Sequence, residues 1–294
     1  MKITNAKGLP EVLVSAARAQ QRDPDPNKWS ITELLSPAHQ RKLQREHWEE
    51  LEEDVTDRIH AILGSGVHAI MEKADGGGHW LQEKTLASST LPVHGTFDAF
   101  DVSTGTLWDI KVTSVWKLVN GSPEEWSRQL NGYRWLMSEQ PGLPEVKALR
   151  VMAFLRDWSK NQAKAQPGNY PDAQVQVIEL PLWTLESTVA FYSSRLAEHV
   201  SAEPPLCTPE ERWQRPTTWA VMKAGNKRAL RVLLSREEAE QYFAEKKPKG
   251  DVSIEERPGE DVRCMDWCSV AKYCEHGRGL AAAASEPSFA EADL

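Results

Sequence analysis

The sequence predicts a mixed α/β (α+β) fold, in which helices flank a central mixed β-sheet, followed by a small C-terminal α+β unit. Short β-rich runs alternate with longer helical runs between residues 80 and 200, and this alternation is typical of a sheet covered by helices. The polar segment 201–205 contains two adjacent prolines and predicts a boundary. Beyond it, three of the four cysteines fall within eleven residues, which predicts a second unit organised around thiols.

The composition is typical of a globular protein, and the sequence patterns favour the cytoplasm. The 294 residues suffice for one elaborated domain or for two domains. No apolar run is long enough for a membrane span, and the N-terminus lacks the pattern of a secretory signal. We therefore expect a cytoplasmic protein with no membrane partner. The formal net charge of -8 argues mildly against nucleic-acid binding, although a local basic groove would suffice for it.

The N-terminal third is predicted to contain a loop and then helices. Residues 1–29 are polar and carry several prolines, which favours a loop. Ser30 and Glu33 have the spacing of a capping box, which marks the start of a helix. From about 38 to 73 the apolar pattern is mainly helical. The Gly-Ser-Gly sequence at 64–66 indicates either a break or the close approach of another element.

The remaining elements complete a core over residues 30–200 and a second unit over 207–276. In the core, strands are predicted at 80–86, 92–101, 106–114, 146–155 and 175–180, and helices at 124–138 and 181–200. In the second unit, a hairpin is predicted at 219–223 and 229–234, and a helix at 235–244. The tail, 277–294, is rich in Ala, Ser and Glu and is predicted to be disordered.

Two carboxylates and a lysine on neighbouring strands are the main chemical signal. A hairpin centred on Ser103 and Thr104 would put Asp98 opposite Asp109, and opposite side chains project from the same face. Strand alternation adds Lys111 to that face, and we expect Asp109 and Lys111 to face a solvent cleft. Carboxylates bind Mg²⁺ or Mn²⁺, such a cation activates water, and a lysine offsets charge on a phosphate. For an isolated Asp-x-Lys pattern, a hairpin with solvated charges is the simpler interpretation.

Further motifs, taken in order, resemble the PD-(D/E)XK nuclease superfamily, in its RecB-like exonuclease branch. The motifs are Gly95-Thr-Phe-Asp98, Asp109-Ile-Lys111 and Gln129-Leu-Asn-Gly-Tyr133, preceded by His68-Ala-Ile-Met-Glu72. Each motif is weak alone, but their order and spacing are fairly specific. The resemblance covers roughly residues 30–200 and implies a nuclease core of that family.

The resemblance implies a role for each residue of these motifs. The catalytic residues would be Asp98, Asp109, Lys111, Gln129 and Tyr133. The ligands of Mg²⁺ or Mn²⁺ would be His68, Asp98, Asp109 and the carbonyl of Ile110. A single histidine on an apolar helix is more often a core residue, so His68 depends on the other motifs. Tyr133 could also be a core residue, because it continues an apolar stripe along its helix.

Basic residues near the predicted site are candidate DNA contacts. Arg128 and Arg134 flank Gln129 on the helix, and Lys117 follows the strand that carries Lys111. Each could bind a phosphate. For any one of them, a solvated surface charge is the simpler interpretation.

Four cysteines, namely Cys207, Cys264, Cys268 and Cys274, could together bind one metal centre. Clustered thiols in a cytosolic chain favour metal ligation over disulfides. Several RecB-like nucleases carry a C-terminal cysteine triplet and a distant fourth cysteine, which implies a [4Fe–4S] cluster, with Zn²⁺ as the alternative. Here three residues, not two, separate the first pair, and the fourth cysteine follows the core. Four unrelated buried thiols are the simplest alternative.

Together these features predict a metal-dependent deoxyribonuclease, an exonuclease that degrades single- or double-stranded DNA from its ends in recombination or repair. The compact layout without helicase motifs resembles phage-encoded versions, which implies the host cytoplasm and a single-strand annealing protein as partner. One alternative is an endonuclease of CRISPR-adaptation or restriction type, although no target-recognition domain is apparent. Another is a non-catalytic DNA-binding module with a structural metal cluster.

Overall fold

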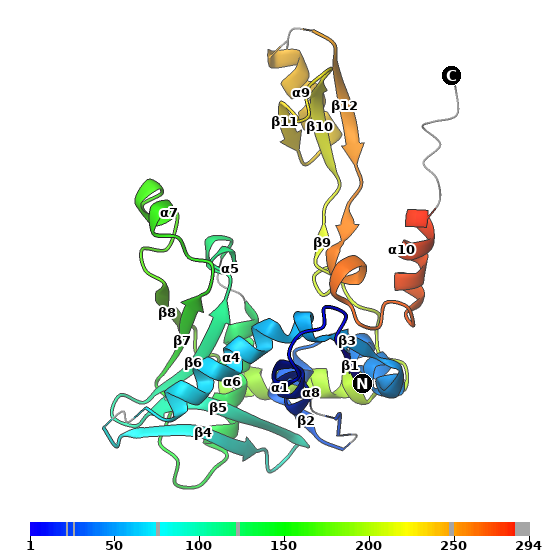
Figure 1. The fold of residues 1–294 in the computed structure, drawn as a ribbon. Helices are drawn as coiled ribbons and strands as arrows, with labels where there is room; N and C mark the ends of the chain where they lie inside the picture. Colours follow the sequence, from blue (N-terminus) through cyan, green and yellow to red (C-terminus); the bar gives the residue numbers. More distant parts are fainter. Residues whose placement is uncertain (22, 26, 75–76, 122–123, 247–249, 286–294) are drawn as a thin grey trace. The chain divides into compact units, whose positions relative to one another are not determined.

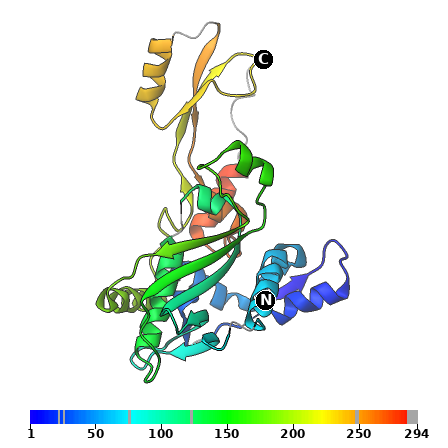
Figure 2. The same ribbon diagram turned by 90° about the vertical axis from the view of Figure 1, so that its left-hand side faces the viewer.

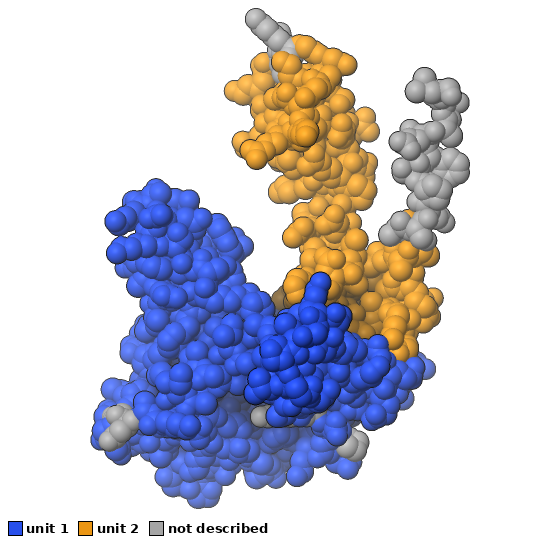
Figure 3. Space-filling view, viewed as in Figure 1, with its two compact units in different colours: residues 1–205 blue, residues 206–294 orange. Residues whose placement is uncertain are grey.

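The computed structural model divides into two compact units, residues 1–205 and 206–294 (Figure 3). It describes residues 1–21, 23–25, 27–74, 77–121, 124–246 and 250–285. The division falls at the end of the proline-containing segment 201–205, where the sequence predicts a boundary. Among the residues described, no helix combines the length and the apolar character needed to cross a membrane.

Unit 1 is built on a six-stranded mixed sheet with helices on both faces, which confirms the predicted fold class (Figures 1 and 2). The strand order is β2-β5-β6-β7-β8, and β4 also pairs with β5. β6 and β7 run parallel, as do β2 and β5, and the other neighbours are antiparallel. The strands are β2 (Trp29–Ser30), β4 (Trp80–Ala87), β5 (Val93–Asp101), β6 (Thr106–Thr113), β7 (Ala148–Leu155) and β8 (Val175–Leu180).

The helices of unit 1 cover the sheet unequally. Helices α6 and α8 lie on one face, and α4 lies on the opposite face (Figures 1 and 2). The helices are α1 (Glu11–Ala19), α2 (Ile31–Leu34), α3 (Ala38–Glu46), α4 (Ile59–Glu72), α5 (Trp116–Val119), α6 (Glu124–Ser138), α7 (Lys160–Ala165) and α8 (Leu185–Val200). The predicted capping box is confirmed, because the Ser30 hydroxyl accepts from the Glu33 amide and the Glu33 carboxylate accepts from the Ser30 amide.

Helix α6 lies at the centre of the main core, and nearly all of its residues from Trp126 to Met137 are buried. The indole of Trp135 stacks on the ring of Tyr192 from α8, with 5.7 Å between centroids. The buried Asn131 amide donates to the Pro181 carbonyl, and its oxygen accepts from the Trp183 amide. Because these bonds satisfy both ends of a buried amide, they connect α6 firmly to the segment that starts α8.

The N-terminal region corrects the predicted loop over residues 1–29. A strand, β1 (Lys2–Thr4), pairs in parallel with β3 (Glu52–Asp54), and helix α1 follows. Val14 and Ala17 of α1 pack in a small second core. The reason is that the apolar residues of α1 recur at helical spacing, which the nearby prolines obscure in the sequence.

The region from 38 to 73 is less continuously helical than predicted. Two short 3₁₀ helices (Trp48–Glu50 and Val55–Arg58) and strand β3 interrupt it before α4 begins. Helix α4 runs through Gly64 and Gly66 without a break, and nothing lies within 4 Å of a Cβ built at either position. The glycines therefore mark neither a break nor a close contact.

Unit 2 contains a three-stranded antiparallel sheet, in the order β11-β10-β12, and a two-stranded pair, β9 and β13. The predicted hairpin is confirmed by the pairing of β10 with β11. The elements are β9 (Gln214–Arg215), β10 (Thr218–Lys223), β11 (Arg231–Leu233), α9 (Arg236–Lys246), β12 (Val252–Arg257), β13 (Glu260–Asp261), a π-helical turn (Arg263–Trp267) and α10 (Glu275–Ser285).

Helix α10 corrects part of the predicted disordered tail, 277–294. Residues 277–285 are helical, and 286–294 lie outside the described residues. The run of four alanines at 281–284 explains the difference, because alanine has the highest intrinsic helix propensity.

The packing of α6 against α8 predicts opposite effects for two helical Gly→Ala substitutions. A Cβ at Gly132 would lie 2.5 Å from the Tyr192 hydroxyl oxygen, and Tyr192 is fully buried. We expect Gly132→Ala to lower the free energy of unfolding by about 1–3 kcal/mol. Gly64→Ala, in open space, should leave it unchanged or raise it by up to about 1 kcal/mol. Urea unfolding measures both, and equal stability of the two variants would contradict the packing described.

Candidate metal and catalytic site

The turn between β5 and β6 sets the register of the strands that carry the predicted site. The Asp101 carboxylate accepts from the Ser103 amide at 2.9 Å and from the Thr104 hydroxyl at 2.7 Å. Gly105 has a φ of +70°, which favours glycine. The turn is therefore centred where the sequence predicts it. Asp101 pairs with Thr106 across it.

The strands β5 and β6 part at the predicted carboxylates. Their ladder ends at the pair Ala99 and Trp108, and one further step would put Asp98 opposite Asp109, as predicted. Beyond the last pair, the Ile110 amide donates to Asp98 Oδ2 at 2.6 Å. The Asp98 carboxylate thus accepts the hydrogen bond that a carbonyl of β5 would otherwise accept. The gap between β5 and β6 is therefore lined by a carboxylate, and the Ile110 amide is still paired.

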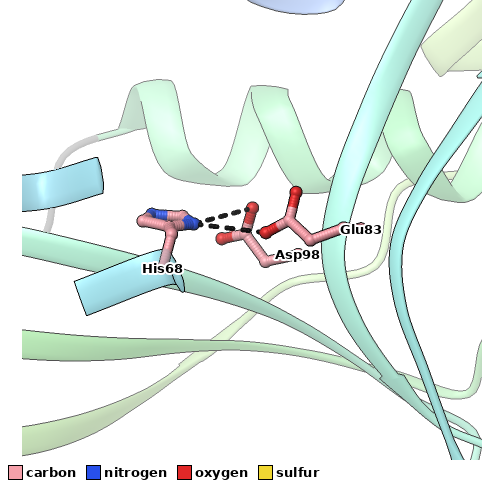
Figure 4. Close-up of side chains that lie close together, drawn as sticks. All are labelled: His68, Glu83 and Asp98. Carbon is pink, nitrogen blue, oxygen red and sulfur yellow. Dashed lines mark ion pairs between the residues drawn. The ribbon is translucent and has the colours of Figure 1, made fainter. Parts of the chain in front are cut away.

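His68, Glu83 and Asp98 converge in this opening from α4, β4 and β5 (Figure 4). His68 Nδ1 lies 3.6 Å from Glu83 Oε1 and 3.6 Å from Asp98 Oδ1. One ligand atom from each residue lies within 4.8 Å of the others. His68 Nε2 lies 3.1 Å from the Ile110 carbonyl oxygen. The structure thus brings together three of the predicted metal ligands, namely His68, Asp98 and the Ile110 carbonyl. The imidazole and the carboxylates suit a divalent cation.

Glu83 is a site residue that the sequence interpretation missed. It lies in a predicted strand beside other polar residues, so nothing distinguishes it locally. Its φ of +46° is rare for a residue other than glycine, and the β4–β5 ladder pairs Gln82 and Lys84 but not Glu83. A hairpin centred on Thr90 and Leu91 would have placed Glu83 opposite Asp98. Glu83 therefore bears the same relation to Asp98 across this hairpin as Asp109 does across the β5–β6 hairpin.

Asp109, Lys111, Gln129 and Tyr133 form a connected network beside this group. Lys111 Nζ lies 2.9 Å from Asp109 Oδ2 and donates to Gln129 Oε1 at 2.9 Å. Gln129 Nε2 donates to Asp109 Oδ1 at 3.1 Å and to the Tyr133 hydroxyl at 2.9 Å. The four residues predicted from two separate motifs are thus in direct contact, with β6 and α6 supplying two each.

Asp109 departs from its predicted setting, because it was expected to face a solvent cleft. It is only 1% exposed, whereas the Lys111 side chain is 26% exposed. Helix α6 covers Asp109 with Gln129. Asp109 Oδ2 is buried and ion-paired with Lys111 Nζ, although the geometry of the pair falls short of a hydrogen bond. The group of converging ligand atoms does not include Asp109.

The electrostatics of the site reflect its concentration of carboxylates. Burial, and then the neighbouring Asp109 carboxylate, raise the pKa of Asp98 to about 7, against the opposing effect of His68. Burial and Asp109 also raise the pKa of the Tyr133 hydroxyl above its usual value. Tyr133 therefore stays neutral. Asp98 holds a proton up to neutral pH, and a cation would have to displace that proton to bind it.

The three predicted DNA contacts are engaged with protein groups. Arg128 Nη2 lies 2.9 Å from Glu124, and Lys117 Nζ lies 2.5 Å from Glu125. Arg134 donates to the Trp183 carbonyl at 2.8 Å. Arg128 and Lys117 could exchange an exposed carboxylate for a phosphate, whereas Arg134 contributes to the connection between α6 and the start of α8.

The four cysteines of unit 2 form no disulfide and are partly exposed. Burial, then Glu211, then Cys264, Cys268 and Cys274 raise the pKa of the Cys207 thiol to about 11. The distant cysteine thus lies within electrostatic range of the triplet. Among the described residues, however, no three cysteine sulfurs lie within 4.8 Å of one another. Zinc would need sulfurs about 3.8 Å apart, and the structure does not bring three of them that close.

Comparisons with known sequences identify no family for this chain. No family model matches the sequence. No curated protein sequence matches it either. A solved structure titled "Crystal structure of SSO0001" matches with a TM-score of 0.44 and 14% sequence identity, over 66% of this chain and 86% of that chain. A likeness of this size carries no argument about fold or function.

The raised pKa of Asp98 predicts how the stability of the metal-free protein depends on pH. Between an unfolded-state pKa near 4 and a folded-state pKa of about 7, the folded protein holds a proton that the unfolded chain releases. The stability that Asp98 contributes is therefore complete at low pH and is lost as the pH rises through 7. Asp98→Asn, which is neutral at every pH, should be more stable than wild type at pH 8 but not at pH 4.

Urea unfolding in the presence of a chelator measures this difference. The expected result is that the gap in unfolding free energy between Asp98→Asn and wild type widens from pH 4 to pH 8. A gap that stays constant over this range would contradict the assigned environment of Asp98.

Proposed function

We propose that unit 1 is a divalent-cation-dependent nuclease that hydrolyses phosphodiester bonds in DNA. The observation that carries this proposal is that two groups of different chemistry are joined through the backbone of Ile110. His68, Glu83 and Asp98 supply ligands for a cation, and the network of Asp109 and Lys111 lies next to them on the adjoining strand. A site for phosphoryl chemistry needs both a cation and a placed positive side chain.

The residues of the network would act on the phosphate and the attacking water. A bound Mg²⁺ or Mn²⁺ would polarise the phosphate and lower the pKa of a coordinated water. The Lys111 ammonium has three donors. In the part of the chain that the structure describes, it contacts Asp109 and Gln129, and a third donor could reach a phosphate oxygen or a water. Because Gln129 bridges Lys111 to Asp109, the ammonium is oriented before the substrate arrives.

The strained backbone at Glu83 favours catalysis over a purely binding role. Residues in rare backbone conformations cost about 1–3 kcal/mol and cluster at functional sites. Glu83, at a φ of +46°, presents its carboxylate to His68. A module that only binds DNA has no need of such a group, because added carboxylates repel phosphates.

Within this class, we propose an exonuclease that acts on DNA ends in recombination or repair, alongside a single-strand annealing protein. This choice follows the resemblance of the motifs to RecB-like enzymes of phage type, which would place the protein in the host cytoplasm. The alternatives are an endonuclease of CRISPR-adaptation or restriction type, or a non-catalytic DNA-binding module.

We also propose that the four cysteines of unit 2 hold a [4Fe–4S] cluster, with zinc as the alternative. The electrostatic proximity of Cys207 to the triplet supports a shared centre, and the resemblance of the cysteine pattern to that of RecB-like nucleases favours the cluster. Its role would be structural, because it would connect the beginning of unit 2 to its end. Iron and zinc analysis of the purified protein separates the two centres.

Incubation of the full chain with linear and covalently closed circular DNA, in Mg²⁺ or Mn²⁺, tests the proposed activity. Degradation of linear DNA alone is expected of an exonuclease, and cleavage of circles would favour an endonuclease. Lys111→Gln should lower the rate about 100- to 1,000-fold by removing a positive group next to the phosphate.

Lys84→Gln is the matched control for Lys111→Gln. Lys84 is an exposed lysine on β4, next to Glu83 in sequence, and its substitution should leave the rate near that of wild type. Equal rates for Lys111→Gln and wild type would refute the assigned site. Absence of cleavage by the wild type, despite DNA binding, would support the non-catalytic alternative.

A further inference from the structure

The buried carboxylate of Asp261 contacts two other segments of unit 2, through Arg212 and His276. Asp261 ends strand β13 and is 6% exposed. Its Oδ2 lies 2.6 Å from His276 Nε2, and its Oδ1 lies 3.2 Å from Arg212 Nε. A buried carboxylate with two positive or donating partners is stabilised in its ionised form, so this group holds the two partners together.

Each partner of Asp261 belongs to a segment that carries a cysteine. The Arg212 guanidinium also donates to the Cys207 carbonyl at 2.7 Å. His276 opens helix α10, two residues after Cys274. Asp261 itself precedes Cys264 by three residues. Three of the four cysteines are therefore attached, through short stretches of backbone, to one carboxylate.

Backbone hydrogen bonds reinforce the same arrangement. Asp261 pairs with Gln214 in the β9–β13 ladder. The Arg263 amide donates to the Arg212 carbonyl at 3.0 Å. These bonds hold the segment around Cys207 and the segment around Cys264 side by side.

We propose that Asp261 is the positioning residue of the cysteine centre, acting through Arg212 and His276. It holds the backbone of Cys207, Cys264 and Cys274 in the arrangement that a cofactor with four thiolate ligands requires. The inference rests on the proposed cysteine centre of unit 2 and is independent of the nuclease activity of unit 1. Groups that orient metal ligands in this way typically affect metal affinity about 10- to 100-fold.

The test compares Asp261→Asn with Glu260→Gln in the full chain. Glu260 is the neighbouring residue on β13, but its carboxylate is exposed and pairs with Arg215 at the surface. Each protein is reconstituted without oxygen from ferrous iron and sulfide, and the rate of iron loss to a chelator is followed by absorbance. Asp261→Asn should lose iron about 10- to 100-fold faster than wild type, and Glu260→Gln should match wild type.

Two further measurements separate positioning from general stability. The electron paramagnetic resonance spectrum of the reduced centre should change in Asp261→Asn, because altered ligand positions change the electronic structure of the cluster. His276→Gln, which removes one of the two partners, should show a smaller increase in iron loss. If Asp261→Asn fails to fold by circular dichroism, His276→Gln decides the question in its place.

Iron retention and a spectrum equal to those of wild type in Asp261→Asn would overturn the inference and leave the cysteine centre standing. Equal behaviour of Asp261→Asn and Glu260→Gln would overturn it as well. If the wild type takes up zinc instead of iron, the same comparison is made with zinc. If it binds neither metal, the cysteine centre and this inference both fail, while the proposed DNA cleavage by unit 1 is unaffected.

Discussion

The candidate site depends on the hydrogen bond from the Ile110 amide to the Asp98 carboxylate. A strand that leaves its neighbour exposes unpaired backbone groups, which is costly in a buried sheet. Here Asp98 satisfies the Ile110 amide, and the His68 imidazole contacts the Ile110 carbonyl. The strands can therefore part without a penalty, and the opening is lined by groups able to bind a cation. The same two side chains, Asp98 and His68, contact the Ile110 backbone and supply ligands for a cation.

The charges around this opening explain the remaining features of the site. Asp98 is partly buried and Asp109 is fully buried, and their mutual repulsion contributes to the raised pKa of Asp98. Lys111 offsets part of the negative charge, and α6 fixes its position through Gln129. The remaining imbalance in the metal-free protein is what a bound divalent cation would relieve. In unit 2, Asp261 illustrates the contrasting case of a buried carboxylate whose charge is balanced within the protein.

Features set by short-range chemistry could be predicted from the sequence. The turn at Ser103 and Thr104 fixes which residues of β5 and β6 face each other, and α6 begins and ends where its pattern predicts. Features that depend on contacts distant in sequence were missed. The role of Glu83 depends on the register of a second hairpin, and the burial of Asp109 depends on how closely α6 packs. Helix α10 was missed because its composition also resembles that of disordered segments.

Crystals of the full chain soaked in Mn²⁺ would test the central claim, that this opening binds a divalent cation. Anomalous scattering locates the ion without reference to any activity. We expect one Mn²⁺ bound by His68, Glu83 and Asp98, next to the Ile110 carbonyl, and loss of that peak in Asp98→Asn. A site that stays without manganese at saturating concentration, or manganese bound only elsewhere in the chain, would contradict it.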